Sequence, residues 1–304
     1  MSRARSIQTP LQEPKEAYFI MRKLSGYCAG LCVLLGGAGV MAAQEMTGPP
    51  KVLVIEREWV KPGKAGAIHD KSESNFVNSF AAAKWPTHYF AAQSMSGRPR
   101  VLFFVGYPSF EAFEKDNKAM EANATLSAAI DKATTSDGEL LSDYDQGVYS
   151  FDPDLSLHTG DIIHDRYFEV SRYVIKPGHR EDWKALVKLY QEGFAGVDRV
   201  NWAVFDSYYG ADNGGVYLVI SKMASLKDDD DGMNDDKTFA STLGPAKMKK
   251  VEELTAACLD ASQTNLFSFN PKMSYPDPSW IAADPFWKAK AAPAAKKPAA
   301  PATP

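Results

Sequence analysis

An internal repeat constrains the fold of this chain more than any other feature of its sequence. The stretch YSFDPDLS at residues 149–156 returns as FSFNPKMS at 267–274, and REWVKPG at 57–63 returns as RYVIKPG at 172–178. Two further pairs keep nearly the same spacing, AKWPTHYF with VNWAVFDS and VLFFVGYPSFEAF with VYLVISKMASLKD. Collinear matches of this kind predict two copies of one folding unit.

Each copy opens with a β-rich, aromatic segment that ends at Lys-Pro-Gly, at residues 51–60 and 166–175. A helix is predicted next. In the second copy its apolar stripe is continuous: Trp183, Leu186, Val187, Tyr190 and Phe194. In the first copy it is thinner: Ile68, Phe76 and Phe80, with Ser72 on the same face. The first helix should therefore be less firmly packed than its counterpart.

The rest of each copy completes the pattern. β-rich runs around glycine-containing turns predict a hairpin, and acidic segments after Ser109 and Ser225 predict helices. The phrases that begin at Tyr149 and Phe267 should form the last strand of each copy. We expect these strands to end at the Asp-Pro and Asn-Pro steps within the phrases.

The order β-α-β-β-α-β is that of the ferredoxin-like arrangement, an α+β fold with helices on one face of an antiparallel sheet. The other sheet face is apolar and needs a partner. The prediction is therefore a pair of tandem ferredoxin-like βαββαβ repeats that form an intramolecular dimeric α/β-barrel. Such a chain can be a monomer with an internal pseudo-twofold axis, with a higher oligomer as the alternative.

The segment before the repeats has the pattern of a secretory signal peptide. Residues 24–43 are apolar, follow Arg22 and Lys23, and end in small residues. Met21 is then the expected true start, and a retained membrane anchor is the alternative. The predicted organisation is a signal peptide at 1–43, a first repeat at 51–157, a linker at 158–165, a second repeat at 166–275 and a C-terminal extension at 276–304 with an Ala/Pro/Lys-rich disordered tail.

The net charge and the cysteine content exclude two features, nucleic-acid binding and an internal disulfide. Residues 1–43 hold five of the 34 Lys/Arg and two of the 38 Asp/Glu, so the rest of the chain has 29 basic and 36 acidic side chains. A net charge of −7 disfavours nucleic acid. Cys258 would be the one cysteine of the mature protein, which excludes an internal disulfide. We expect a secreted or periplasmic protein without a membrane span after signal removal.

The segment SRYVIKPGHREDWKALVKLYQE resembles the start of a NIPSNAP-type domain, and both halves resemble dimeric α/β-barrel proteins more widely. The first copy departs from the motif, because Glu58 stands where the second copy has Tyr173. The resemblance implies the barrel fold. It does not select a function, since the superfamily includes cofactor-free monooxygenases, isomerases, haem enzymes and proteins without known chemistry.

Two duplicated arginines are the first candidates for binding. Strand alternation places Arg57 and Arg172 on the apolar face of their strands, where a charge needs a partner. An internal ion pair is the favoured interpretation, and an anion-binding group is the alternative. The remaining ligand-binding candidates are Trp85, His88, Tyr89, Trp202 and Tyr173. A histidine beside a tyrosine could move protons near neutral pH.

No metal site and no cofactor are predicted. The linker holds scattered donors at His158, Asp161, His164 and Asp165, and residues 227–236 are acidic without the spacing of a calcium loop. The sequence thus predicts an exported, non-catalytic α/β-barrel that binds a small ligand or a partner. The alternative is a cofactor-independent monooxygenase or isomerase acting on a small aromatic or enolisable molecule.

Overall fold

The computed structural model describes residues 48–210, 215–233 and 235–288, all within one compact unit. The strands are β1 (Val52–Val60), β2 (Tyr89–Ser94), β3 (Arg100–Tyr107), β4 (Leu141–Leu157), β5 (Tyr167–Ile175), β6 (Trp202–Gly210), β7 (Val216–Met223) and β8 (Leu259–Phe269). The helices are α1 (Ala67–Ala83), α2 (Phe110–Ala122), α3 (Ala124–Asp137), α4 (Arg180–Phe194), α5 (Lys227–Gly232), α6 (Asp235–Cys258), α7 (Pro278–Ala283) and the short 3₁₀ turn η1 (Pro285–Trp287).

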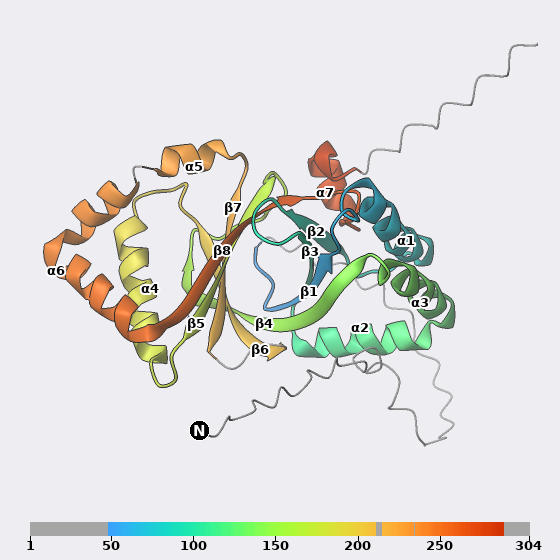
Figure 1. Cartoon of the computed structure of the whole chain (residues 1–304), viewed down its shortest axis with the longest axis horizontal. Helices are drawn as coiled ribbons and strands as arrows, with labels where there is room; N and C mark the ends of the chain where they lie inside the picture. Colours follow the sequence, from blue (N-terminus) through green and yellow to red (C-terminus); the bar gives the residue numbers. More distant parts are fainter. Residues whose placement is uncertain (1–47, 211–214, 234, 289–304) are drawn as a thin grey trace, which may run out of the picture. The chain divides into compact units, whose positions relative to one another are not determined.

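The strands close into one antiparallel barrel in the order β1-β3-β2-β8-β5-β7-β6-β4 (Figure 1). Each half contributes four neighbouring strands in the same relative order, β4-β1-β3-β2 and β8-β5-β7-β6. The halves are joined by backbone pairing of β2 with β8 and of β4 with β6. The chain is therefore an α+β protein with a closed eight-stranded antiparallel barrel, in which the two sheets are hydrogen-bonded along both edges.

The repeated phrase forms the junction between the halves. The Ser156 hydroxyl donates to the Asp152 carbonyl at 2.7 Å and accepts from the backbone N–H of Val204 in β6 at 2.9 Å. In the other half, the Ser274 hydroxyl donates to the Asn270 carbonyl at 2.8 Å and accepts from the N–H of Ala91 in β2 at 2.9 Å. Each phrase thus ties its own half to the first hairpin strand of the other half through one serine hydroxyl.

The predicted strand ends are confirmed in one half. Strand β8 ends at Phe269, directly before the Asn-Pro step. Strand β4 continues past Asp152-Pro153 to Leu157, although its pairing with β6 is irregular between Asp152 and Leu157. The proline removes a backbone donor, so it interrupts the ladder without ending the extended chain.

Side chains of alternating strand positions divide the apolar core into inner and outer parts. Residues such as Ile55, Phe104 and Phe168 point into the barrel with the residues around them. The opposite strand faces pack under helices, for example Val54 near Phe113 of α2. The apolar interior shared by the two halves was predicted from the bare sheet faces.

The predicted C-terminal extension contributes to the fold through its first residues. Residues 276–288 form α7 and η1, and Trp287 is 1% exposed within the core of the barrel. Its indole N–H donates to the Ile163 carbonyl at 2.8 Å. The tail from residue 289 and the predicted signal peptide lie outside the described residues. Within the described ranges, no helix combines the length and apolar character needed to span a membrane.

Candidate metal-binding site

Four metal-ligating side chains gather beneath the helices of the first half. Glu58, His69, Glu73 and Asp137 are 7%, 1%, 3% and 1% exposed. One potential ligand atom from each lies within 4.8 Å of those of the other three. Burying three carboxylates with one imidazole costs free energy unless protons or a cation compensate the charge.

Local structure explains how the four residues meet. His69 and Glu73 are four residues apart in α1, so they share its inward face. Glu58 alternates with the inward-facing Arg57 and so points to the helix-covered side of β1. Asp137 is the last residue of α3, 64 positions further along the chain than Glu73. Two helices and one strand thereby converge on a single point.

This arrangement corrects the predicted stripe of α1. Ile68, expected to face the sheet, is 52% exposed, and its neighbour His69 is buried instead. The buried face of α1 is therefore polar at its N-terminal end, where the predicted stripe has Ile68 and Ser72.

A single imidazole nitrogen faces all three carboxylates. The distances from His69 Nε2 are 3.1 Å to Glu58 Oε2, 3.6 Å to Glu73 Oε1 and 3.6 Å to Asp137 Oδ1. Ligands about 2.1 Å from a tetrahedral metal ion are about 3.4 Å from one another. The separations around His69 Nε2 therefore match those of atoms that share one small cation.

Hydrogen bonding within the protein leaves this cluster incomplete. Nε2 can donate one hydrogen bond, and Glu58 is the carboxylate within hydrogen-bond distance. Glu73 Oε1 and both carboxylate oxygens of Asp137 are buried without a well-formed hydrogen-bond partner among the described residues. An unsatisfied buried polar atom costs about 1–3 kcal/mol, so such atoms are rare in native proteins.

The charges of the cluster are strongly coupled. Burial, followed by the charges of Glu58 and Asp137, raises the pKa of Glu73 well above its usual range. Burial also raises the pKa of Glu58. Burial alone would lower the pKa of His69, but Asp137 and Glu58 raise it to about 9. Burial opposes the ionisation of Asp137, yet the nearby His69 and Ser72 groups lower its pKa. Without a cation, protons must therefore hold the site together.

Two neighbours extend the polar environment. Burial, and then the charge of Glu58, raises the pKa of Glu56 to about 7. The Tyr89 hydroxyl is buried without a hydrogen-bond partner among the described residues. Burial and then the charge of Glu73 raise the pKa of Tyr89 well above its usual value. Tyr89, a predicted binding residue, thus lies in the electrostatic field of the cluster.

The second half shows that the fold does not require this cluster. Tyr173 occupies the position of Glu58, and Trp183 and Val187 are buried four residues apart near the start of α4, as His69 and Glu73 are in α1. These three residues of the second half belong to an apolar core together with Leu254 and Cys258 of α6. The rings of Tyr173 and Trp183 are 5.1 Å apart. The same helix–sheet interface can therefore be filled by hydrocarbon, which is often at least as stable as buried charges.

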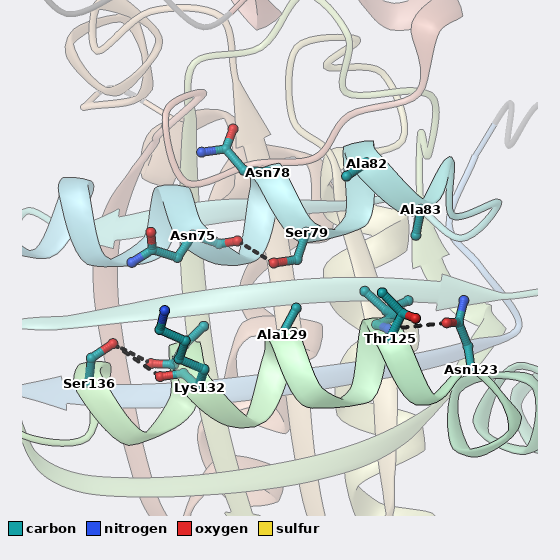
Figure 2. A pocket seen from close by; sticks show the side chains of 12 residues that line it. Asn75, Asn78, Ser79, Ala82, Ala83, Asn123, Thr125, Ala129, Lys132 and Ser136 are labelled. Atoms are coloured by element: carbon teal, nitrogen blue, oxygen red, sulfur yellow. Dashed lines mark hydrogen bonds between the residues drawn. The ribbon is translucent and has the colours of Figure 1, made fainter.

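An open groove lies between the same two helices, α1 and α3, and has a volume of about 560 Å³ (Figure 2). Small or polar side chains line it, among them Ser79, Ala83 and Ala129. The Ser79 hydroxyl is used within α1, because it donates to the Asn75 carbonyl at 2.7 Å. The four cluster residues are not among those lining this groove. The cluster therefore lies outside this groove.

The matching helices of the second half are closely packed. A Cβ atom at Gly193 of α4 would lie 2.3 Å from the ring of Phe239 in α6. The Phe239 ring also stacks on Tyr190 and Phe194, with centroids 4.9 and 4.8 Å away. The halves thus differ at the interface between helices and sheet and also in the packing of the two helices against each other. The buried polar cluster and the open groove are both in the first half.

The duplicated arginines occupy the barrel interior, as strand alternation predicted. Arg57 pairs with Asp145 and donates to the Tyr149 hydroxyl at 2.9 Å. An internal ion pair was the favoured interpretation for this residue. Arg172 is half-buried in β5, between the register partners Leu218 and Gln263.

The other predicted binding residues do not form one site. Tyr275 connects three of them: its hydroxyl donates to the Trp85 carbonyl at 2.9 Å, and its ring lies 4.7 Å from His88 and 6.2 Å from Tyr89. Burial lowers the pKa of His88. Trp202, in the other half, donates to the Leu155 carbonyl at 2.8 Å. These residues therefore contribute mainly to packing and to the junction of the halves.

The linker donors are also dispersed. His158 contacts the Val200 carbonyl at 2.9 Å, and His164 contacts Asp284 at 3.3 Å. Lys222 pairs with Asp165 at 3.1 Å. The prediction of no metal site concerns this linker and the acidic run and does not include the cluster under α1. Glu58 in place of Tyr173 and the His-x₃-Glu spacing in α1 were the available signals.

Comparison with known proteins adds a likeness in fold. No family model matches the chain, and no curated protein does. An anthrone oxidase-like protein is 15% identical, with 76% of this chain and 94% of that chain covered and a TM-score of 0.48. A provisionally named monooxygenase from Fusobacterium nucleatum subsp. nucleatum is 12% identical, with 74% and 94% covered and a TM-score of 0.48.

A mutant chlorite dismutase from Candidatus Nitrospira defluvii, in complex with cyanide, is 11% identical, with 76% and 94% covered and a TM-score of 0.42. At such identities these matches carry no information about chemistry. They do not test the NIPSNAP resemblance, which stays a prediction.

Proposed function

We propose that this protein binds one divalent metal ion between Glu58, His69, Glu73 and Asp137. The observation that carries the proposal is a set of buried carboxylate oxygens around one imidazole nitrogen, three of which have no well-formed hydrogen-bond partner in the described part of the chain. A divalent cation would replace the protons that the cluster otherwise needs, because three carboxylates and a neutral imidazole leave a net charge of −1 around it.

The donor set selects among metals. Carboxylate oxygens suit Mn²⁺, Mg²⁺ and Ca²⁺, whereas an imidazole nitrogen suits Zn²⁺ and Fe²⁺. Cysteine is missing from the cluster, which disfavours soft ions. Ions that accept both oxygen and nitrogen, namely Mn²⁺, Fe²⁺ and Zn²⁺, fit best. Ca²⁺ fits less well because it takes six to eight oxygen ligands.

We propose a non-catalytic role for this ion. The four side chains are almost completely buried, and the groove above them is lined by other residues. A metal held there would join α1, α3 and β1, and so set the position of the two helices that border the groove. A small ligand or partner bound by those helices would then sense the metal. A cofactor-independent monooxygenase or isomerase remains the alternative, but no described residue pair favours it.

The proposal is tested by calorimetric titration of EDTA-treated protein with Mn²⁺, Zn²⁺, Mg²⁺ and Ca²⁺. The expected result is binding of one Mn²⁺ or Zn²⁺ per chain, with much weaker binding of Mg²⁺ and Ca²⁺. The double variant His69→Gln, Glu73→Gln should lose this binding. Absence of stoichiometric binding by every ion would leave the cluster as a proton-linked structural network and refute the proposal.

We further propose that the halves are tandem ferredoxin-like copies in a dimeric α/β-barrel related to NIPSNAP-type domains. Their sequence echoes and equal strand order support this. Export is proposed from the apolar segment that precedes the barrel. N-terminal sequencing of the protein from its native host should then find a mature chain that begins near Ala43, and retention of residues before Leu24 would contradict export.

A further inference from the structure

A second polar site lies at the end of the barrel beside the β2–β3 hairpin, where Arg57 and Arg100 of the inner face lie near the exposed Arg98. Arg57 and Trp59 follow Leu53 and Ile55 on the inner face of β1. Arg100 is the register partner of Trp59 and shares the inner face of β3 with Leu102 and Phe104. Arg98 precedes it in the hairpin, and its guanidinium lies 5.7 Å from the centre of the Trp59 ring.

Positive charge exceeds negative charge at this point. Arg57 has a carboxylate partner in Asp145. Arg98 and Arg100 form no ion pair with the carboxylates of the described residues. They donate instead to neutral oxygens, Arg98 to Ser142 Oγ at 2.9 Å and Arg100 to Asn265 Oδ1 at 2.5 Å.

The remaining nearby carboxylate does not balance these charges. Asp143, the register partner of Trp59 on β4, is exposed, and its side chain accepts a hydrogen bond from the N–H of Tyr144 at 3.0 Å. Burial, followed by the charges of Arg57 and Arg98, lowers the pKa of Arg100. An arriving anion would relieve this repulsion.

Aromatic rings complete the site. The Arg100 guanidinium lies 5.0 Å from the centre of the Phe267 ring, as Arg98 does near Trp59. Stacked guanidinium groups keep their edge N–H donors available for a planar or tetrahedral oxyanion.

The second half again shows that the fold does not need these residues. At the positions of Trp59, Arg100 and Asp145 it carries Val174, Val216 and Gln263, and only Arg57 is duplicated, as Arg172. The excess of arginine is therefore peculiar to the first half of the barrel.

We infer that Arg98 and Arg100 bind the oxyanion group of a small molecule, a carboxylate or a phosphate, against the Trp59 ring. This site is separate from the metal cluster, because Arg57 and Trp59 point into the barrel whereas Glu58 points toward α1. It does not depend on the metal-binding proposal.

The test is calorimetric titration with inorganic phosphate and with benzoate, at an ionic strength held constant with NaCl and without added metal. At least one probe should bind saturably with one site per chain, and the probe that binds identifies the oxyanion class. Arg100→Gln should weaken binding at least tenfold. Arg180→Gln, which removes the same charge from the N-terminus of α4, should leave it unchanged.

Arg100→Lys keeps the charge but loses the forked donor geometry, so it should weaken binding severalfold even if Arg100→Gln fails to fold. The inference is overturned if neither probe binds saturably to the unchanged protein. It is equally overturned if a folded Arg100 variant binds as tightly as the Arg180→Gln control.

Discussion

Replacement of Glu73 by Gln tests whether the Glu73 carboxyl group is a metal ligand or has only a structural role. In the metal-free protein, burial and then the charges of Glu58 and Asp137 raise the pKa of Glu73, which favours its protonated form, and glutamine has nearly the same shape. The free energy of unfolding without metal should therefore change by less than about 1 kcal/mol, typical of a substitution that creates no cavity or stranded charge. With metal, however, one charged ligand is lost.

The size of the metal effect follows from binding linkage. At a metal concentration of 100 times the Kd, the unchanged protein gains about 2.7 kcal/mol. Loss of even an outer partner of a metal ligand typically weakens affinity 10–100-fold, so loss of a direct ligand should cost at least 100-fold. The gain at the same metal concentration then falls to about 0.4 kcal/mol. For a folded region of this size the difference corresponds to about 5–9 °C in Tm.

Thermal melts with and without Mn²⁺ measure both quantities. Glu121→Gln is the matched control, since Glu121 is exposed in α2 of the same half. The control should show the full metal-induced rise in Tm, and Glu73→Gln should show almost none. An equal rise in both variants would refute the role of Glu73 as a ligand. A loss of more than about 2 kcal/mol in the metal-free variant would show that Glu73 is ionised and paired.

Three further results are expected. The pKa of His69 is about 9, so a metal ion must displace its proton, and the metal-induced rise in Tm should grow from pH 6 to pH 9. Without metal, the raised pKa of His69 stabilises the folded protein at low pH. This stabilisation should be lost as the pH rises from about 6.5 to 9. A flat pH response would contradict this. Arg57→Leu leaves Asp145 without its ion-pair partner. Because the Arg57 and Asp145 side chains are 13% and 28% exposed, the free energy of unfolding in urea should fall by about 1–3 kcal/mol, less than for a fully buried pair. An unchanged urea midpoint would count against the ion pair. Ser274→Ala leaves a buried N–H unpaired and should cost about 1–3 kcal/mol, more than Ser156→Ala in the less buried junction; the reverse order would refute the junction argument.

Much of the fold was predictable because the repeats carry local patterns. Lys-Pro-Gly turns and β-rich runs located the strands, and the Asn-Pro step marked the end of β8, whereas β4 continues past its Asp-Pro step to Leu157. Side-chain alternation placed Arg57 in the barrel. Helix breaks were harder to predict: α3 begins after a cap at Asn123, and α6 is kinked at Gly244-Pro245. Burial of Trp287 depends on how the extension packs, which no local pattern specifies.

The cluster could not be derived because it is a tertiary arrangement. His69 and Glu73 resemble exposed polar residues until the rotation of α1 over β1 is known. The apolar stripe predicts a rotation of α1 that buries Ile68, but Ile68 is exposed and its neighbour His69 is buried. Asp137 arrives from the end of another helix, at a distance in sequence that carries no periodic signal. The sequence does contain one difference between the copies at this site: Glu58 in the first copy stands where the second copy has Tyr173.

The most direct measurement is anomalous X-ray diffraction from crystals of the protein loaded with Mn²⁺. The account predicts one anomalous peak per chain, about 2.0–2.3 Å from His69 Nε2 and from carboxylate oxygens of Glu58, Glu73 and Asp137. It would be contradicted by electron density in which these four side chains contact only one another or ordered water, with Mn²⁺ absent from the space between them.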